Sequence, residues 1–130
     1  MEHVKKRLQN DKFAERCGIE LLSVSAGHAT ARMVLKPHHL NGIGTVQGGA
    51  IFTLGDFTFA AAANSHGTVS VAINASITFM KAAQTGTLTA EARELSTNFK
   101  IGTYSVEIKD EHGDLVAHFQ GLAYKKKDKL

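Results

Sequence analysis

The stretch that limits the fold most is residues 50–65, AIFTLGDFTFAAAANS, which is apolar on almost every side. Its alanine-rich second half favours a helix, and Gly67 follows where a glycine commonly ends one. A helix without a polar face is buried on all sides. Gly55 in its middle lowers helix propensity and predicts close packing against another element. We therefore expect a helix from about Gly49 that the rest of the chain encloses.

Extended segments surround this run. Residues 3–16 have the spacing of a short amphipathic helix, and residues 19–26 and 29–36 have the pattern of a strand hairpin. Four more strands follow residue 68, separated by turns at 84–86, 100–102 and 110–114. Hairpin-joined strands favour an antiparallel sheet. We predict a single α+β domain, residues 1–130, in which a six-stranded antiparallel sheet wraps around one long buried helix.

The net charge of the chain lies in its last residues. The formal charge is +3, and the basic tail 125–130, KKKDKL, accounts for all of it. The remaining residues carry eleven basic and eleven acidic side chains. A neutral body without a basic stripe or interleaved aromatic residues is not typical of a nucleic-acid-binding protein. We expect the tail to be a solvated, frayed end.

Other features favour a protein of the cytoplasm. Cys17 is the only cysteine, which excludes a disulfide framework and a cysteine-based zinc site. Residues 1–13, MEHVKKRLQNDKF, lack the apolar core of a signal peptide. The longest apolar run is interrupted by Asp56 and is too short to span a membrane. We therefore expect a reduced, cytoplasmic protein with no membrane partner.

The strand predicted at residues 68–82 points to a partner of another kind. It carries apolar residues at both parities, for example Val71 and Ala72, so neither of its faces is purely polar. One helix covers only one face of a six-stranded sheet. Homo-oligomerisation is the expected way to cover the remaining apolar surface.

Asp56 is the one carboxylate inside the apolar run. A buried charge costs several kcal/mol unless it is paired or hydrogen-bonded. Such a group is either a general base or nucleophile, or a structural carboxylate that ties the helix to the sheet or to another subunit. Composition and spacing leave both alternatives open.

Gly48 and Gly49 fall at the predicted start of the buried helix, where the first N–H groups have no intrahelical partner. A helix end of this kind binds an anion or a developing oxyanion, although paired glycines are also common turn residues. Asp56 lies eight residues after Gly48, roughly 12 Å along the axis. If the two cooperate on one atom, Asp56 comes from the neighbouring subunit of a dimer.

Other polar candidates are weaker. His38 and His39 are loop histidines rather than a metal pair, because no acidic or cysteine partner has metal-ligand spacing. Asn41 precedes Gly42 and is either a turn residue or an amide donor to a ligand. The serines lack the histidine and aspartate spacing of a hydrolase triad.

The loop and helix together resemble a known family. Residues 37–67, PHHLNGIGTVQGGAIFTLGDFTFAAAANSHG, are similar to the hotdog-fold acyl-CoA thioesterases of the PaaI-like group, named for phenylacetate degradation. The resemblance extends over roughly residues 12–124, through SITFMKAAQTGTLTAEA and DEHGDLVAHFQG. The positions that match the family motif in residue and spacing are Pro37, His39, Asn41, Gly44, Gly48, Gly49 and Asp56.

The resemblance implies thioester hydrolysis at sites shared by two subunits. The N–H of Gly48 then polarises the thioester carbonyl, helped by the side chain of Asn41, and Asp56 of the opposite subunit activates water or attacks directly. His39 and Gly49 are the expected substrate-binding positions beside them. The resemblance also implies homodimers that pair into tetramers, no metal and no bound cofactor, since coenzyme A is part of the substrate.

Position 47 departs from the family pattern. The family has histidine there, and this chain has Gln47, which donates a hydrogen bond but carries no titratable proton. We expect lower activity or an altered pH profile rather than none, because a thiolate leaves without full protonation. The relatives also carry a water-orienting serine or threonine on the strand after the helix, and this chain has Ala72 at about that position. Asn74 or Ser76 is the remaining candidate for that role.

The main hypothesis is therefore an acyl-CoA thioesterase for an apolar or aromatic acyl group. The alternative is a weakly active or inactive acyl-CoA-binding hotdog protein, because of Gln47. A hotdog dehydratase would pair a histidine with the carboxylate, and the expected histidine is absent. Phe57 either lines the acyl pocket or packs in the core, and core is the more usual place for it.

Overall fold

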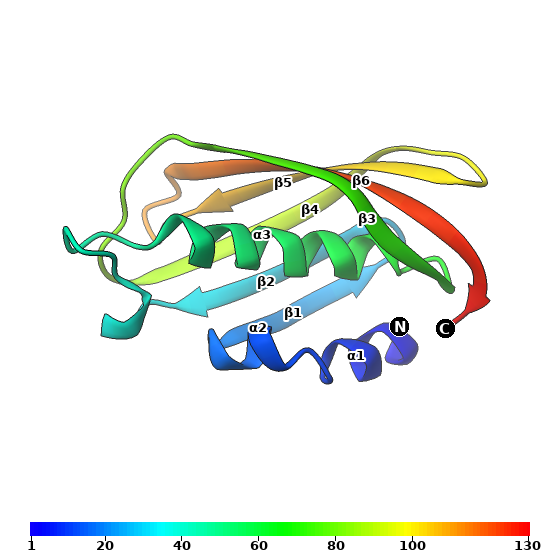
Figure 1. The fold of residues 1–130 in the computed structure, drawn as a ribbon, viewed down its shortest axis with the longest axis horizontal. Coiled ribbons are helices and arrows are strands. Elements are labelled where there is room, and N and C mark those ends of the chain that lie inside the picture. The colour runs from blue at the N-terminus through cyan, green and yellow to red at the C-terminus, as the bar shows by residue number, and fades with distance from the viewer.

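The computed structural model describes all residues, 1–130. Six strands form one antiparallel sheet in the order β1-β2-β4-β5-β6-β3, and the long helix α3 lies against one face of it (Figure 1). This confirms the predicted six-stranded α+β arrangement. The elements in chain order are α1 (Glu2–Leu8), α2 (Lys12–Arg16), β1 (Ile19–Ser25), β2 (His28–Val34), a 3-10 turn (Pro37–His39), α3 (Gly48–Ala63), β3 (Thr68–Phe79), β4 (Thr87–Thr97), β5 (Ile101–Lys109) and β6 (Leu115–Lys129).

The N-terminal helix is short, as predicted, and a second short helix follows it. The side chain of Asp11 accepts a hydrogen bond of 2.9 Å from the backbone N–H of Ala14 and caps the start of α2. An aspartate in this position favours the start of a new helix over the continuation of the old one. The segment expected as one helix therefore bends at Asp11, which fixes the direction of this carboxylate.

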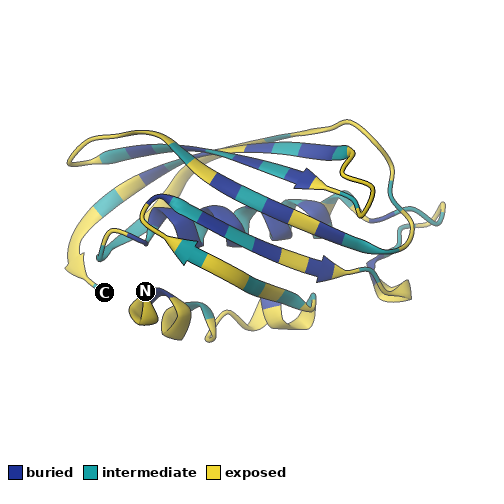
Figure 2. Cartoon of the chain, turned by 180° about the vertical axis from the view of Figure 1, so that it is seen from behind, coloured by how far each residue is buried: buried dark blue, intermediate teal, exposed yellow.

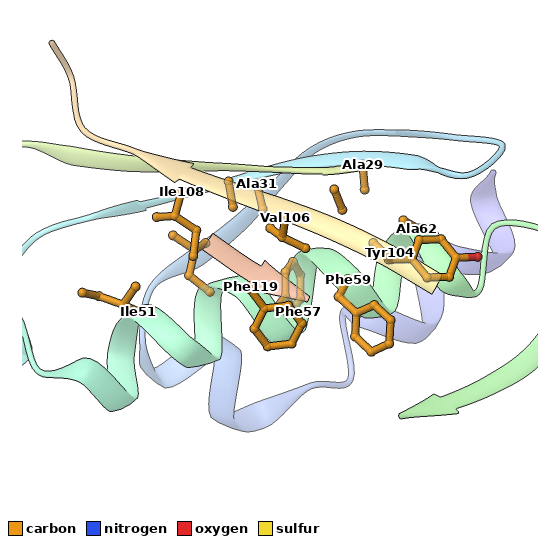
Figure 3. Packing of buried hydrophobic residues seen from close by; sticks show 14 of the residues in the cluster. Ala29, Ala31, Ile51, Phe57, Phe59, Ala62, Tyr104, Val106, Ile108 and Phe119 are labelled. Atoms are coloured by element: carbon orange, nitrogen blue, oxygen red, sulfur yellow. The ribbon is translucent and has the colours of Figure 1, made fainter. Parts of the chain in front are cut away.

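Helix α3 is buried because its apolar residues meet the sheet on several sides. The rings of Phe52 and Phe59 lie 5.2 and 5.7 Å from that of Phe119 of β6, and Phe59 and Phe119 pack between the helix and the sheet (Figure 3). A Cβ atom at Gly55 would lie 3.1 Å from the ring of Phe119, so the close approach predicted for this glycine is confirmed. Buried and exposed residues alternate along the central strands (Figure 2). None of the helices combines the length and the apolar run required for crossing a bilayer.

Strand β3 is an edge of the sheet. Its twelve residues pair only with β6, and most of them are exposed. The exposed side chains include Val71, Ile73 and Phe79. A long edge with unpaired backbone groups and apolar side chains is a surface that another chain can extend.

The basic tail is ordered as part of a strand, so the expectation of a frayed end was wrong. Strand β6 runs to Lys129, with Lys125 opposite Ser70 and Lys129 opposite Thr68 of β3. The backbone N–H of Leu130 also donates to the carbonyl of Gly67 at 3.0 Å. Backbone pairing with β3 provides the order, and a lysine-rich composition gives no sign of it.

Candidate active site

A short loop holds the start of α3, and His39 anchors it. The ring of His39 is buried; its Nε2 donates to the carbonyl of Cys17 at 2.7 Å and its Nδ1 accepts from the N–H of Lys36 at 2.9 Å. Its backbone carbonyl accepts a 2.8 Å bond from the N–H of Gln47. Both ring nitrogens are therefore in use, and His39 supports the loop rather than offering a group to a substrate.

Asn41 closes the same loop. Its Oδ1 accepts from the N–H groups of Ile43 and Thr45 at 3.0 and 3.1 Å, and its Nδ2 donates to the hydroxyl of Thr45 at 3.0 Å. These bonds are the turn chemistry that Asn before Gly favours. An amide group has two N–H hydrogens, so one of them is left for a ligand. The turn role is therefore confirmed, and the role of Asn41 as a donor to a ligand stays a prediction.

The first two amides of α3 have no acceptor in the chain. Neither Gly48 nor Gly49 donates its N–H to a backbone or side-chain group, as expected for the first turn of a helix. Gln47 occupies the N-cap position, where its exposed side chain makes no capping bond. A helix start with free N–H groups and a partial positive charge suits a carbonyl oxygen that becomes negative.

The ring of Phe79 lies beside Gly48 at the start of α3. A Cβ atom at Gly48 would lie 3.1 Å from the end of the Phe79 ring, so glycine allows the end of β3 to lie close to the helix start. The two residues line an open cavity of about 420 Å³, together with Ile51 and Met80. The free amide of Gly48 therefore lies in a largely apolar setting.

Asp56 lies in the middle of α3, half-buried, and makes no hydrogen bond or ion pair within the chain. Burial, and secondarily the negative charge of Asp11, raise the pKa of its carboxyl group above the ordinary value. A raised pKa makes the carboxylate a stronger base. An unpartnered carboxylate with this property is unusual as a purely structural group.

The surroundings of Asp56 differ from those of Gly48. Its neighbour Phe57 lines a cavity of about 490 Å³ under the N-terminal helices. Phe57 is therefore a core residue, as expected, that also forms part of a cavity wall, and its place in an acyl pocket stays a prediction. The other residues around this cavity are Lys5, Leu8, Gln9, Asp11, Ala14, Glu15, Ile19, Glu20, Leu21 and Leu22.

Within one chain the candidate residues thus form two groups. Gly48, Gly49, Gln47 and Asn41 gather at the N-terminal end of α3, whereas Asp56 and Phe57 lie two turns further along. Asn74 stands apart from both, exposed on the β3 edge at a β-bulge. No three histidine, cysteine, aspartate or glutamate side chains converge as metal ligands.

Two residues of this region were missed from the sequence, Asp11 and Phe79. Asp11 precedes a short helical pattern, which is the signal of an N-cap, but its proximity to α3 depends on tertiary packing. Phe79 ends a strand pattern and carries no local sign of its contact with Gly48.

Comparisons with known proteins agree with this architecture. Residues 43–117 match the model of the thioesterase superfamily. A protein of Archaeoglobus fulgidus is 42% identical over 127 residues, which cover 96% of this chain and 82% of that protein. The acyl-coenzyme A thioesterase PaaI of Escherichia coli is 35% identical over 118 residues, 90% of this chain and 84% of its own length. The solved structure of the E. coli PaaI protein from the phenylacetic acid degradation operon has a TM-score of 0.95 at 32% identity, covering 98% of this chain and 94% of that one.

Proposed function

This chain belongs to the thioesterase superfamily as a PaaI-like hotdog acyl-CoA thioester hydrolase, and we propose that its substrates carry apolar or aromatic acyl groups. We further propose that Gly48 and Asp56 perform the reaction. The single observation that carries this assignment is a pair of unused groups: free amides at the start of α3, and an unpartnered carboxylate of raised pKa in the same helix.

The proposed reaction begins with the thioester carbonyl at Gly48. The N–H groups of Gly48 and Gly49 donate to the carbonyl oxygen and stabilise the negative charge that it gains. Asp56 accepts a proton from a water molecule as the water oxygen bonds to the carbonyl carbon. The tetrahedral intermediate then expels the thiolate of coenzyme A, which leaves the free acid.

Direct attack by Asp56 is the alternative form of the same step. The carboxylate oxygen would bond to the carbonyl carbon, expel the thiolate and leave a mixed anhydride, which water then hydrolyses. Hydrolysis in ¹⁸O-labelled water under single-turnover conditions tests for this route. An unlabelled oxygen from Asp56 in the first product molecule would show direct attack followed by hydrolysis at the aspartyl carbon, whereas general-base catalysis, like hydrolysis at the acyl carbon, gives a labelled product.

The two groups come together across a homodimer in this proposal. Strand β3 is a long apolar edge, and pairing it with β3 of a second copy would bury Val71 and Ile73. Asp56 of one subunit would then serve Gly48 of the other. We propose dimers that pair into tetramers, in the cytoplasm, without a metal or bound cofactor.

The cavity beside Phe57 supports a neutral, apolar acyl group. Apolar side chains from three elements, among them Leu8, Ile19 and Phe57, form part of its lining. Its three carboxylates, Asp11, Glu15 and Glu20, outnumber the one ammonium group, that of Lys5, and would repel an acyl group that carries its own negative charge. The cavity therefore favours aryl or alkyl over dicarboxylic acyl groups.

A panel of aryl, alkyl and dicarboxylic acyl-CoA substrates tests this assignment. Release of coenzyme A is followed with a thiol reagent, beside Asp56→Asn as the inactive control. The highest kcat/KM is expected for an aryl or alkyl substrate. A preference for succinyl- or malonyl-type substrates would contradict the proposed substrate class.

A second candidate rests on Gln47. Because this residue cannot supply a positive charge or a proton, the chain is alternatively a weak or inactive acyl-CoA-binding protein. Micromolar binding of acyl-CoA with turnover no faster than that of Asp56→Asn would favour this candidate over the main one.

A further inference from the structure

The lysines that could meet the phosphates of coenzyme A are not equally available. Lys81 forms ion pairs of 2.7 Å with Asp110 and 2.6 Å with Asp114, which tie the end of β3 to the turn between β5 and β6. Its charge is therefore already neutralised. Seven exposed lysines take part in no ion pair, and four of them belong to the end of β6 or to the turn before β5: Lys100, Lys126, Lys127 and Lys129.

These four lysines gather at one corner of the molecule. Lys126, Lys127 and Lys129 belong to the end of β6, which continues past β5 as an arm paired only with β3. The backbone N–H of Lys125 donates to the carbonyl of Lys100 at 2.7 Å, which places the β4–β5 turn beside the arm. We call residues 125–129 the lysine arm. Its red ribbon ends beyond the C-terminal end of α3 (Figure 1).

The other charged groups at this corner leave it positive. Asp128 is the one acid within the lysine arm. Glu94, whose carboxylate accepts bonds of 2.6 and 2.7 Å from His66 and the hydroxyl of Tyr104, is a second acid nearby, so the lysines outnumber the acids. Since the rest of the chain is neutral, the excess positive charge of the protein is concentrated here.

An exposed aromatic ring lies beside the lysines. Phe99, in the β4–β5 turn, is 84% exposed, and the ammonium group of Lys100 lies 5.8 Å from the centre of its ring. An exposed ring next to positive charges is a surface on which a nucleotide base stacks while its phosphates bind the lysines. The combination fits a nucleotide better than a simple anion.

The arm lies at the end of the helix face that carries Asp56. Asp56, Ala60 and Asn64 follow one another at four-residue intervals on α3 and share a face. Asn64 binds the backbone of Ser70 through bonds of 2.8 and 3.2 Å, and Ser70 pairs with Lys125. Asp56 is about 10 Å along the axis from the last residue of α3. The pantetheine arm of coenzyme A is long and flexible, and it links a thioester near Asp56 to a nucleotide beyond the helix end.

We propose that the lysine arm, with Lys100 and Phe99, binds the 3′-phosphorylated adenosine diphosphate of coenzyme A on the subunit that supplies Asp56. The site rests on the proposed function and deepens it. The phosphates carry about four negative charges, which the free lysines balance. The base stacks on Phe99, and the bound nucleotide directs the thioester toward the cleft between subunits.

The experiment compares two substrates with the same acyl group, an acyl-CoA and the matching N-acetylcysteamine thioester, which lacks the nucleotide. The variant is Lys126→Gln/Lys127→Gln, and its matched control is Lys6→Gln/Lys109→Gln, which removes the same charge from two exposed lysines outside any ion pair. We expect the arm variant to raise KM for the acyl-CoA about fivefold at unchanged kcat, as for two exposed charge pairs. For the truncated thioester, kcat/KM stays at the wild-type value.

Two further arms complete the test. Phe99→Ala should also raise KM for the acyl-CoA and leave that for the truncated thioester unchanged. Added salt should weaken acyl-CoA binding to the wild type more than to the arm variant. Equal KM values for wild type and arm variant would overturn the proposal, and so would an equal loss with both substrates. Binding of the wild type and the arm variant to phosphatidylglycerol vesicles and to duplex DNA is measured in parallel. If the variant binds vesicles or DNA more weakly than the wild type does but binds coenzyme A equally well, the proposal is overturned.

Failure of the proposed catalytic function can be distinguished from failure of the proposed nucleotide site. A wild type that hydrolyses neither substrate contradicts the catalytic assignment. Titration of free coenzyme A by calorimetry still tests the arm in that case, with a fivefold weaker affinity expected for the variant and an unchanged affinity refuting the site.

Discussion

Gly48 and Asp56 lie on the same helix, eight residues and about 12 Å apart along its axis, and only Gly48 lines the cavity beside Phe79. Gly48 faces the end of β3 through Phe79, whereas the neighbours of Asp56 line cavities beside the N-terminal helices. A single subunit therefore cannot bring both to one carbonyl group. In the proposed dimer, Asp56 of the second subunit takes this place.

The role of the Gly48 N–H in catalysis can be tested by removing this group. Gly48→Pro deletes the N–H, and proline is well tolerated at the first position of a helix. The preceding residue, Gln47, already has φ −58° and ψ 130°, which is the conformation that a residue before proline adopts. We expect kcat to fall about 100- to 1,000-fold, the usual loss for one oxyanion-stabilising donor, in a steady-state assay.

Gly48→Ala is the matched control, because it keeps the N–H and introduces the same Cβ contact with Phe79. Its kcat should stay much closer to that of the wild type. Equal losses in the two variants would assign the effect to crowding at Phe79 and not to the missing hydrogen bond.

Asp56 should be essential for turnover and unfavourable for stability. Asp56→Asn is expected to lower kcat about 100- to 10,000-fold, the range for a positioned general base.

The pKa of Asp56 is raised in the folded state, so its charged form destabilises the native state, and this destabilisation is fully present above the folded pKa. The variant should therefore melt at a higher temperature than the wild type at pH 7.

The stability difference also has a defined pH dependence. It should shrink as the pH falls through the folded pKa of Asp56 and vanish below the unfolded value of about 3.9, where the wild-type group is protonated in both states. Thermal melts from pH 3.5 to 7.5 measure it. A variant less stable than the wild type at pH 7 would instead indicate a structural bond to Asp56.

Asp11 should influence the pH profile through its charge. After burial, which is the larger cause, its carboxylate raises the pKa of Asp56. Asp11→Asn removes the charge and keeps the helix cap, since asparagine caps as well as aspartate. The acidic limb of kcat/KM should move to lower pH, with the melting temperature nearly unchanged. An unmoved acidic limb would show that Asp11 acts only as a cap.

Gln47→His should return a titratable donor to the loop. A charged imidazolium makes a stronger hydrogen bond than a neutral amide, by about 1 kcal/mol, so kcat should rise about fivefold below pH 6. The pH profile of kcat should gain an inflection near the ordinary pKa of histidine, about 6.5. A profile without the new inflection would place residue 47 away from the reacting atoms.

Much of this fold was predictable because its main signal is local. The all-apolar run of α3 demands enclosure by a sheet, and Gly55 marked its contact with the sheet through Phe119. Hairpin-joined strands then leave few antiparallel arrangements. The alternation of Tyr104, Val106 and Ile108 along β5 appears in the structure as buried positions.

What escaped prediction depends on contacts between distant segments. The lysines of β6 have a solvated composition, and only their pairing with β3 makes them a strand. His39 matches a position of the family motif, yet both of its ring nitrogens form hydrogen bonds with backbone groups, those of Cys17 and Lys36. The fold brings Cys17 close to the ring. The position of Asp11 beside α3 likewise requires the packing of α2, which its short helical pattern does not reveal.

The most direct test of the two-subunit site is complementation between two inactive variants. Gly48→Pro and Asp56→Asn subunits are refolded together, and mixed dimers are verified by native mass spectrometry. Each mixed dimer contains one site with an intact Gly48 amide and an intact Asp56, so random mixing should restore about a quarter of wild-type activity from two nearly inactive parents. Verified mixed dimers that stay as inactive as their parents would contradict the account.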